Sequence, residues 1–452
     1  MKLTIAKTDL QTALKAVSAS KSSTGSDISS HYLFKVFNPP DASGDAQVEI
    51  AAYSGQTFAS APIPGVTVEG ADADGFTIEG WRLEKWLLPI PEDKVLTFTY
   101  TPQESKAVEA RAARAAQQFN SLDPSKFPSW EKSFAKSTVT ATMPASLLYS
   151  ILNYAKDFVS DDDTKHPEQT VVECRKKKIT LPKKNPNDKD EKPAEIDVGV
   201  VYAMDGMHAV QIRCPALKDS TFRIHGKDLK GIVSFLASIK EYPVELLEDI
   251  PPKDAPPGSE PTTLILRQLR TDEKPTSFYG ENRFTTPFPS LGLPGSTDHY
   301  LWTLPKEEVT GWVITNCEAG AENKDTKLRI VREGDVIKMA IKNPPPSSAW
   351  IPYEITTDPE VKVTDLDPEA ADPPALAADG FMVNKNSFRA ALKSMPGDNP
   401  RFGVNKLGRG GYLRFVREEG PNGEILTEGK LDGVEVKVED RTTYLTVVAW
   451  VR

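Results

Sequence analysis

Apolar residues recur along the chain in one arrangement that appears six times. Each copy has an apolar residue at its centre, another two positions earlier, and others five, eight, nine and twelve positions later. The centres of the six copies are Ile5, Ile78, Met143, Ile224, Leu304 and Val383. Apolar residues two apart share one face of a strand, and the later set forms one stripe of a helix of about three turns. Each copy therefore predicts a strand that runs directly into an amphipathic helix.

The copies are nearly evenly spaced, and stretches of alternating polarity such as 95–100 and 171–174 follow the helices and predict further strands. The fifth copy departs from the pattern at its last position, where Asn316 replaces the apolar residue and Cys317 follows it. A single apolar stripe of this kind is explained by ordinary packing of a helix against a core. Six copies in the same register instead indicate an internal repeat.

A coarser repeat groups the six copies into pairs. A Phe-Pro dipeptide occurs late in the first pair, at Phe127-Pro128, and again late in the second, at Phe288-Pro289. Two copies per domain give three domains, which agrees with 452 residues at about 150 per domain. The sequence thus predicts an α+β fold of three tandem, similar domains, each built of two strand–helix–sheet halves. The predicted domains are 1–135, 136–297 and 298–452.

Charge and hydrophobicity narrow the class of protein. The formal net charge is −9, which argues against tight, salt-dependent nucleic-acid binding over most of the surface but allows contact through one small face. The 39% of hydrophobic residues suffices for ordinary cores, and no run approaches the ~18 apolar residues of a membrane span. The N-terminal residues show no apolar signal region. We expect a soluble, cytoplasmic protein with no membrane contact.

Thiol and imidazole side chains show no pattern typical of a metal or disulfide site. The three cysteines, Cys174, Cys214 and Cys317, are odd in number and widely separated, so buried thiols are expected rather than disulfides. No two of the five histidines have the spacing of a local zinc site, and the common nucleotide-binding and hydrolase motifs are absent. The sequence thus predicts no enzyme activity, no cofactor and no metal.

Three polar segments deserve a separate interpretation. Gly408–Gly411 precedes a strand-like stretch and is predicted to be a turn rather than a phosphate-binding loop. The acidic run Asp161–Asp163 and the basic run Arg175–Lys178 are both predicted to be solvated loops. For the acidic run, the alternative is a metal site. For the basic run, it is a nucleic-acid patch.

Taken in order, several segments make the chain resemble the bacterial DNA polymerase sliding clamp, the beta subunit of the replicative polymerase. The segments that carry the resemblance are Met1–Ile5 with Leu10–Val17, Ser121–Pro128, Val201–Val210 and Tyr444–Arg452. Met207-His208-Ala209 replaces the family's His-Arg-Leu, and Ala449–Arg452 replaces its Met-Pro-Met-Arg-Leu ending. The chain also carries Pro-rich insertions at about 175–195, 249–261, 343–378 and 417–432. This divergence suits a bacteriophage-encoded member.

The resemblance implies a DNA clamp fold that forms a ring lined by helices, and the repeat supports this independently. Six helices side by side would enclose a hole of only ~9 Å, whereas twelve would leave ~28 Å, enough for a duplex about 20 Å across. Two copies, joined head to tail as a homodimer, therefore suffice to encircle double-stranded DNA. The expected function is a processivity factor that tethers the replicative polymerase and other replication proteins, loaded by a clamp loader.

Basic residues on or next to the helices are candidates to face the encircled DNA. They contact phosphates without reading sequence, which permits sliding. The candidates are Lys15, Lys21, Lys85, Lys156, Lys230, Arg389 and Lys393.

The resemblance also implies a cleft between the second and third domains that binds extended partner peptides. Apolar walls, a glycine that admits the peptide backbone and a large aromatic residue suit such a cleft. The implied residues are Pro167, Met204, Gly206, Met207, His208, Ala209, Pro289, Val447, Val448, Trp450 and Val451.

Two alternatives of other classes remain open at this point. One is a metal-dependent phage nuclease that uses the carboxylates near Asp161. The other is a structural phage protein built of repeated β-rich modules. A divalent-metal requirement for nuclease activity would favour the first, and assembly without DNA-linked partners would favour the second.

Overall fold

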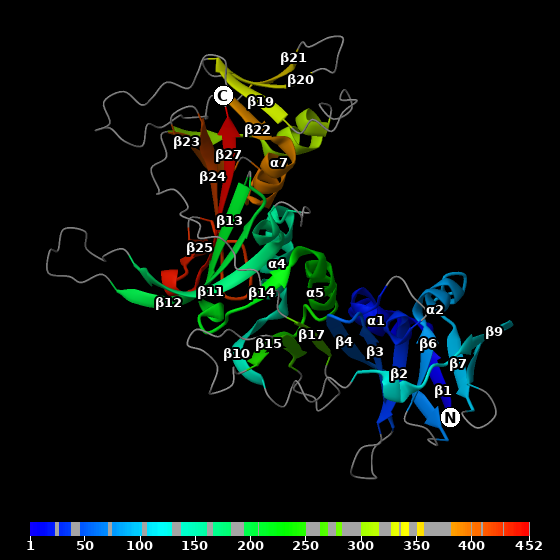
Figure 1. Ribbon diagram of the computed structural model, residues 1–452. Helices are drawn as coiled ribbons and strands as arrows, with labels where there is room; N and C mark the ends of the chain where they lie inside the picture. The colour runs from blue at the N-terminus through cyan, green and yellow to red at the C-terminus, as the bar shows by residue number, and fades with distance from the viewer. Residues whose placement is uncertain are drawn as a thin grey trace. The chain divides into compact units, whose positions relative to one another are not determined.

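In the computed structural model, each of the six predicted copies is a strand that leads into a helix (Figure 1). The pairs are β1 (Lys2–Ala6) with α1 (Lys7–Val17), β6 (Gly75–Glu79) with α2 (Gly80–Leu87), β10 (Ser137–Pro144) with α4 (Ala145–Ala155), β14 (Arg223–His225) with α5 (Gly226–Ser238), β18 (Tyr300–Thr303) with a helix containing η7 (Glu308–Val313), and β22 (Phe381–Asn384) with α7 (Lys385–Ser394). The predicted strand–helix repeat is confirmed.

The structure describes most of the chain, with gaps mainly in the long connections. The described residues are 1–22, 27–37, 46–70, 75–101, 106–128, 137–160, 166–181, 194–206, 208–249, 263–269, 277–282, 300–315, 327–333, 336–342, 350–356, 381–398, 400–407, 410–427 and 429–451. Contacts divide the chain into two compact units. The first is Met1–Leu152 with Asp219–Thr285, and the second is Asn153–Lys218 with Thr286–Arg452.

The first unit contains two antiparallel sheets. One sheet has the order β5 (Thr67–Glu69), β1, β7 (Val95–Tyr100), β8 (Ala107–Ala112), β9 (Ala115–Asn120). The other has the order β10, β15 (Pro243–Asp249), β16 (Thr263–Gln268), β17 (Phe278–Asn282), β4 (Thr57–Ile63), β3 (Gln47–Tyr53), β2 (His31–Phe37), β6. In the second sheet Phe278 pairs with Ser60, so strands on both sides of residue 135 form one continuous sheet.

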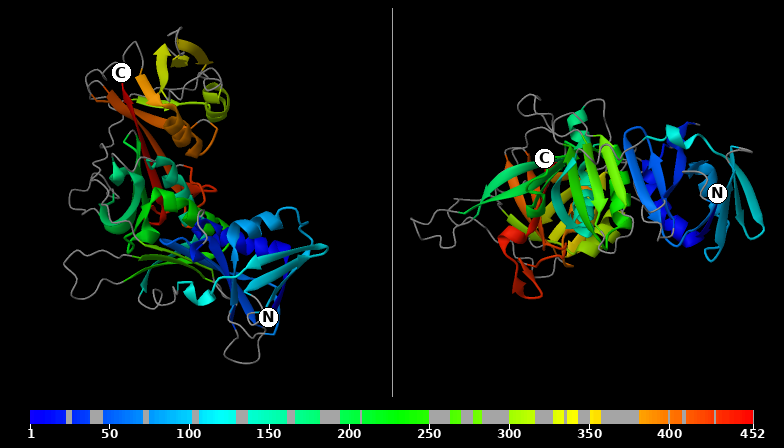
Figure 2. Two further views of the ribbon diagram at one scale, coloured as in Figure 1. Left: turned by 45° about the vertical axis from the view of Figure 1, so that its right-hand side comes forward. Right: turned by 90° about the horizontal axis from the view of Figure 1, so that it is seen from below.

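The strands of the second unit also form a continuous antiparallel sheet. Their order is β11 (Val171–Thr180), β12 (Glu195–Met204), β13 (His208–Cys214), β27 (Thr442–Val451), β22, β19 (Lys327–Glu333), β20 (Val336–Lys342), β21 (Trp350–Thr356). A branch runs from β27 through β24 (Gly410–Glu419) and β23 (Arg401–Leu407) to β18. The long strand β27, red in Figures 1 and 2, pairs with both β13 and β24. A separate pair, β25 (Lys430–Leu431) with β26 (Val434–Glu435), lies before β27 in sequence.

The apolar stripes of the helices are buried as the pattern requires. In α1 the residues Leu10, Ala13, Leu14 and Val17 are at most 7% exposed, which places this whole face in the core. Burial of apolar area contributes ~25 cal/mol per Å², so these stripes are the main stabilising contribution of each helix. In the second unit, α7 packs Phe388 and Leu392 into one core.

A π-helical stretch explains the irregular fifth copy. The backbone N–H of Ile314 donates to the Val309 carbonyl, five residues earlier, instead of the usual four. Val309 and Ile314 are both fully buried in the same core. A π turn accommodates one extra residue per turn, which agrees with the one-position shift of the apolar pattern towards Cys317. Asn316 and Cys317 themselves lie outside the described residues.

The prediction for the basic run was wrong. Arg175–Lys178 lies in β11 and pairs with residues 197–200 of β12, so these residues form a strand and not a loop. The apolar partner strand, with Val198 and Val200 buried, supplies the pairing that overrides local charge. Lys177 also lies over the Tyr202 ring at 5.1 Å. Asp161–Asp163 lies outside the described residues.

The glycine-rich stretch is only partly described. Gly410 and Gly411 belong to β24 and pair with Leu407 and Lys406 of β23, so the predicted turn does not extend over them, and Gly408 and Arg409 lie outside the described residues. Cys174 and Cys214 are both buried, as expected for these thiols. No helix in the described residues is long and apolar enough to cross a membrane. The boundaries near residues 135 and 297 remain a prediction.

Candidate functional site

Four of the predicted cleft residues, Met204, Gly206, His208 and Ala209, lie at or next to the turn between β12 and β13. Met204 ends β12 and pairs with Ala209, and His208 begins β13. Asp205 closes the turn, because its Oδ1 accepts a hydrogen bond from the His208 backbone N–H at 3.0 Å and contacts the His208 ring Nδ1. Gly206 has a φ of 86°, a conformation that favours glycine. Met207 lies outside the described residues.

The segment that begins at Pro167 lies against this turn. Pro167 starts the short helix η5 (Pro167–Thr170), and the Thr170 hydroxyl donates to the Pro167 carbonyl at 2.7 Å. A Cβ atom on Gly206 would lie 3.0 Å from the side-chain oxygen of Gln169, so the two segments are in close contact. Pro167 is half-buried. Pro289 lies outside the described residues.

The C-terminal residues belong to a paired strand rather than to a tail. His208 pairs with Val448 and Ala209 with Val447, which brings the first two C-terminal candidates beside the β12–β13 turn. Trp450 pairs with Val383, and Val451 with Met382. The resemblance implied a C-terminal strand followed by a tail, but Trp450 and Val451 still belong to the strand, because β22 and β24 continue the sheet along this end of β27. Val448 is fully buried in the core of the second unit.

A cavity of about 340 Å³ lies beside His208. Its lining residues are Asp157, Asp205, His208, Asn384, Asn386, Ser387 and Ala390. They come from η4 (Lys156–Phe158), from the β12–β13 turn and from the start of α7. Burial raises the pKa of the Asp157 carboxyl, and the neighbouring Lys156 ammonium partly opposes that shift.

Sequence reasoning found only His208 among these lining residues. A sequence signal existed for Asn384, because asparagine directly before an apolar helical stripe is typical of a helix N-cap. Asp205 stands in Val201–Val210, one of the segments that carry the resemblance. No local signal marks Asp157 or Ser387, since the chain folding that brings η4 to α7 is long-range.

The predicted DNA-facing residues differ in exposure and in partners. Lys15, Lys85, Lys156, Lys230 and Lys393 are exposed. Lys21 has a side chain only 10% exposed, with its ammonium 3.5 Å from the Glu84 carboxylate. Arg389 is half-buried and donates to the Thr315 hydroxyl at 3.4 Å. Free phosphate contact is thus open to the five exposed lysines more than to Lys21 or Arg389.

Two of these lysines lie on helices that contact each other. The Ser234 hydroxyl of α5 donates to the Lys15 carbonyl of α1 at 3.2 Å. Lys230 precedes Ser234 by one helical turn, so it shares a face with it. The first unit therefore carries Lys15 and Lys230 on neighbouring exposed helix faces.

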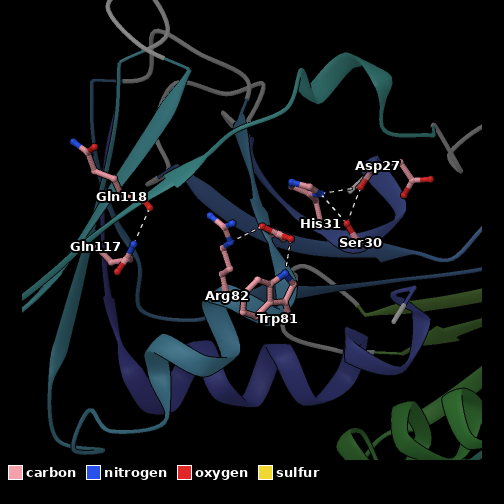
Figure 3. A network of polar contacts seen from close by, with 8 residues as sticks. Asp27, Ser30, His31, Trp81, Arg82, Gln117 and Gln118 are labelled. Atoms are coloured by element: carbon pink, nitrogen blue, oxygen red, sulfur yellow. Dashed lines mark hydrogen bonds and ion pairs between the residues drawn. The ribbon is translucent and has the colours of Figure 1, made fainter. Parts of the chain in front are cut away.

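In each unit, one sheet ends at a strand whose outer edge has no partner strand among the described residues. In the first unit this strand is β9, where Ala115–Gln118 are exposed. Figure 3 shows Gln117 and Gln118 on β9 and Trp81 and Arg82 at the start of α2. Trp81 is 50% exposed, with its indole N–H and Arg82 both directed to Glu79. In the second unit the last strand is β21.

The histidine in the same view has a structural explanation. His31 is buried, and its Nδ1 lies 2.9 Å from the Asp27 carbonyl and 3.2 Å from the Ser30 hydroxyl (Figure 3). Within the described residues, no group of three or more His, Cys, Asp or Glu side chains is arranged to hold a metal ion. The carboxylates at Asp161–Asp163, on which the nuclease alternative rests, lie outside these residues.

Repeated strand–helix halves and long antiparallel sheets define the sliding-clamp fold, and comparison with solved structures shows that the chain has this fold along its whole length. The DNA polymerase III subunit beta of Pseudomonas aeruginosa matches with a TM-score of 0.67 at 12% identity, covering 100% of both chains. The beta subunit of Thermotoga maritima gives 0.66 at 13%, and the sliding clamp of Bacillus subtilis 0.63 at 15%, each covering 100% of this chain and 99% of its own. No protein-family model matches the chain. No curated protein matches its sequence.

Proposed function

We propose that the chain is a DNA sliding clamp, a non-catalytic processivity factor that encircles duplex DNA and tethers a replicative polymerase. The observation that carries this proposal is the full-length structural match to bacterial DNA polymerase III beta subunits. The internal repeat of the sequence predicts the same architecture independently of this match. The three-domain division at about 135 and 297 belongs to this proposal.

Ring closure needs a second copy of the chain, because the six helices of one copy enclose too small a hole for a duplex. The outer edges of β9 and β21, two of the sheet edges in the described residues, suit a head-to-tail arrangement. The β9 edge of one copy would pair with the β21 edge of the next, and this contact, repeated twice, closes a ring. Exposed Trp81 and Arg82 beside β9 supply the aromatic and cationic side chains that are enriched in interfaces.

The exposed lysines are proposed to face the encircled DNA. Lys15 and Lys230 on the contacting helices α1 and α5, together with Lys85, Lys156 and Lys393, give a positive lining in a chain of net charge −9. Such a lining attracts phosphates without reading bases and so permits sliding. Lys21 and Arg389, which already have protein partners, are expected to contribute less.

Partner peptides of the polymerase and of a clamp loader are proposed to bind around the β12–β13 turn and the C-terminal half of β27. The close contact of Gly206 with Gln169 and the pairing of His208 and Ala209 with β27 support a common site for these segments. Pro289, Met207, Trp450 and Val451 complete the proposed set.

The oligomeric mass in solution tests the ring. Sedimentation equilibrium should give twice the chain mass of 49.7 kDa. Gln118, which is exposed and opposite Glu109 in a non-hydrogen-bonded pair, directs its backbone N–H to the outer edge of β9. Gln118→Pro removes this N–H and should shift the equilibrium to monomers, whereas the matched variant Gln118→Ala should stay dimeric. A wild-type monomer at the concentrations used for replication assays would contradict the proposal.

A further inference from the structure

The cavity beside His208 differs from an apolar peptide cleft in the chemistry of its walls. Six of its seven lining residues carry polar or ionisable side chains, and Ala390 is the exception. Asp157 and Asp205 supply two carboxylates, while none of the seven is Lys or Arg. The cavity therefore offers more acceptors and negative charge than a site for an aliphatic side chain would need.

The nearby helix terminus does not make this cavity an anion site. Asn384 caps α7, since its Oδ1 accepts hydrogen bonds from the backbone N–H groups of Asn386 at 3.0 Å and Ser387 at 3.3 Å. These two groups, which would otherwise attract an anion, are already satisfied. Because Asp157 and Asp205 are both among the lining residues, the charge of the cavity wall favours a cation.

Ser387 provides an independent sign that a ligand belongs here. Ser387 is one of the lining residues and is only 2% exposed, and its buried hydroxyl oxygen has no hydrogen-bond partner among the described residues. A buried polar group without a partner costs about 1–3 kcal/mol, so proteins seldom retain one. A ligand that reaches into the cavity would satisfy it.

We propose that the cavity binds the guanidinium of an arginine side chain from a partner peptide. Asp157 receives two of its N–H groups, and Ser387 accepts a third. The inference rests on the proposed partner site, which shares His208 with this cavity, and it names the chemistry that site selects.

Guanidinium fits these acceptors better than the other candidates do. It presents five donors in a planar fork and stays charged at any physiological pH, so it matches a carboxylate in two parallel hydrogen bonds. A lysine ammonium lacks this fork. A neutral carboxamide would leave the Asp157 charge unpaired. A metal ion would need more carboxylate or imidazole ligands than this wall supplies.

Selection from a displayed library of random nine-residue peptides tests the inference on the whole chain. The library is panned in parallel against the wild type, Asp157→Asn and the control Glu439→Gln. Glu439 is an exposed carboxylate in the short helix Val438–Asp440, so its substitution removes the same charge outside the cavity. We expect arginine to be enriched at one peptide position on the wild type and the control but not on Asp157→Asn.

Affinity measurements on the best synthetic peptide then separate charge from shape. Citrulline has nearly the shape of arginine without its charge, and exchanging the two should weaken binding to the wild type about tenfold. On Asp157→Asn the same exchange should change the affinity less than about twofold, and Ser387→Ala should weaken the arginine peptide severalfold. A single cooperative thermal unfolding transition in each variant, at a midpoint no lower than that of the wild type, shows that the fold is retained.

The possible results distinguish this inference from the proposed function. If peptides are selected at the site but carry no enriched arginine, or bind citrulline as well as arginine, the inference is overturned while the partner site stands. If no peptide is selected at all, the partner site itself is contradicted. Lysine enriched equally with arginine would overturn the assignment to a guanidinium.

Discussion

Arg417 is the centre of a buried polar network that holds the second unit together. Its guanidinium forms an ion pair with Glu419, whose side chain is 1% exposed, and it donates to the Ser394 carbonyl at 3.2 Å. It also lies over the rings of Tyr444 at 4.6 Å and Tyr154 at 5.8 Å. The Tyr444 hydroxyl donates to Glu419 at 2.5 Å. The network thus joins β24 and β27 to the ends of α4 and α7.

Arg417→Ala leaves the buried Glu419 carboxylate without its ion-pair partner. Removing one partner of a buried ion pair typically costs ~3–5 kcal/mol, because the other charge is left without compensation. The Arg417 side chain is itself 14% exposed, so the lower half of this range, ~3 kcal/mol, is the expected loss. Replacing both partners, as in Arg417→Met with Glu419→Leu, should recover most of it.

Urea unfolding followed by tryptophan fluorescence measures the loss, and hydrogen exchange of β24 and β27 locates it. Arg213→Ala is the matched control, because Arg213 is an exposed arginine on β13 of the same sheet. It should change the free energy of unfolding by less than ~0.5 kcal/mol. If Arg417→Ala costs less than ~1 kcal/mol, or if the double variant is as unstable as the single one, the buried pair does not act as described.

Three further predictions follow from single features. Replacing four exposed lysines together by Glu, at Lys15, Lys85, Lys156 and Lys230, should weaken DNA association and reduce its salt dependence, as filter binding across a salt series would show. The unfolding midpoint should stay nearly unchanged. DNA binding as strong as that of the wild type would contradict a DNA-facing role. Gly199→Ala should lower the thermal midpoint in calorimetry, because the added Cβ would lie 2.3 Å from the Leu217 carbonyl oxygen; an unchanged or raised midpoint would contradict this packing. Asp157→Asn should stabilise the protein at pH 7, because burial raises the pKa of Asp157 above its unfolded value and the ionised form therefore opposes folding. Urea titrations should show that the gain in unfolding free energy disappears as the pH falls below 3.8. A gain that is constant with pH would contradict the prediction.

The sequence predicted the strand–helix units because their stabilisation is local and periodic. An apolar stripe such as Leu10, Ala13, Leu14 and Val17 is readable from spacing alone, and the structure buries all four. Even the departure in the fifth copy had a structural meaning, since the one-position shift matches the π turn between Val309 and Ile314. A one-residue insertion leaves such a shift in the pattern.

The errors came from contacts between distant segments. The basic run Arg175–Lys178 looks like a loop by charge, but β12 pairs with it and makes it a strand. Trp450 and Val451 stand close to the C-terminal end of the sequence, where a tail is expected, but β22 and β24 pair with this part of β27 and continue the sheet along it. The cavity of Asp157, Asp205 and Ser387 depends on three segments meeting, and no spacing in the sequence encodes that meeting.

Retention on circular DNA tests the claim of an encircling ring most directly. Subunits separated at high salt are returned to low salt with a nicked circular plasmid, and the protein bound to DNA is isolated by gel filtration. We expect bound protein to stay with the circular plasmid and to be lost when one restriction cut makes the DNA linear, because a ring slides off a free DNA end. Protein that stays equally bound before and after the cut would contradict it.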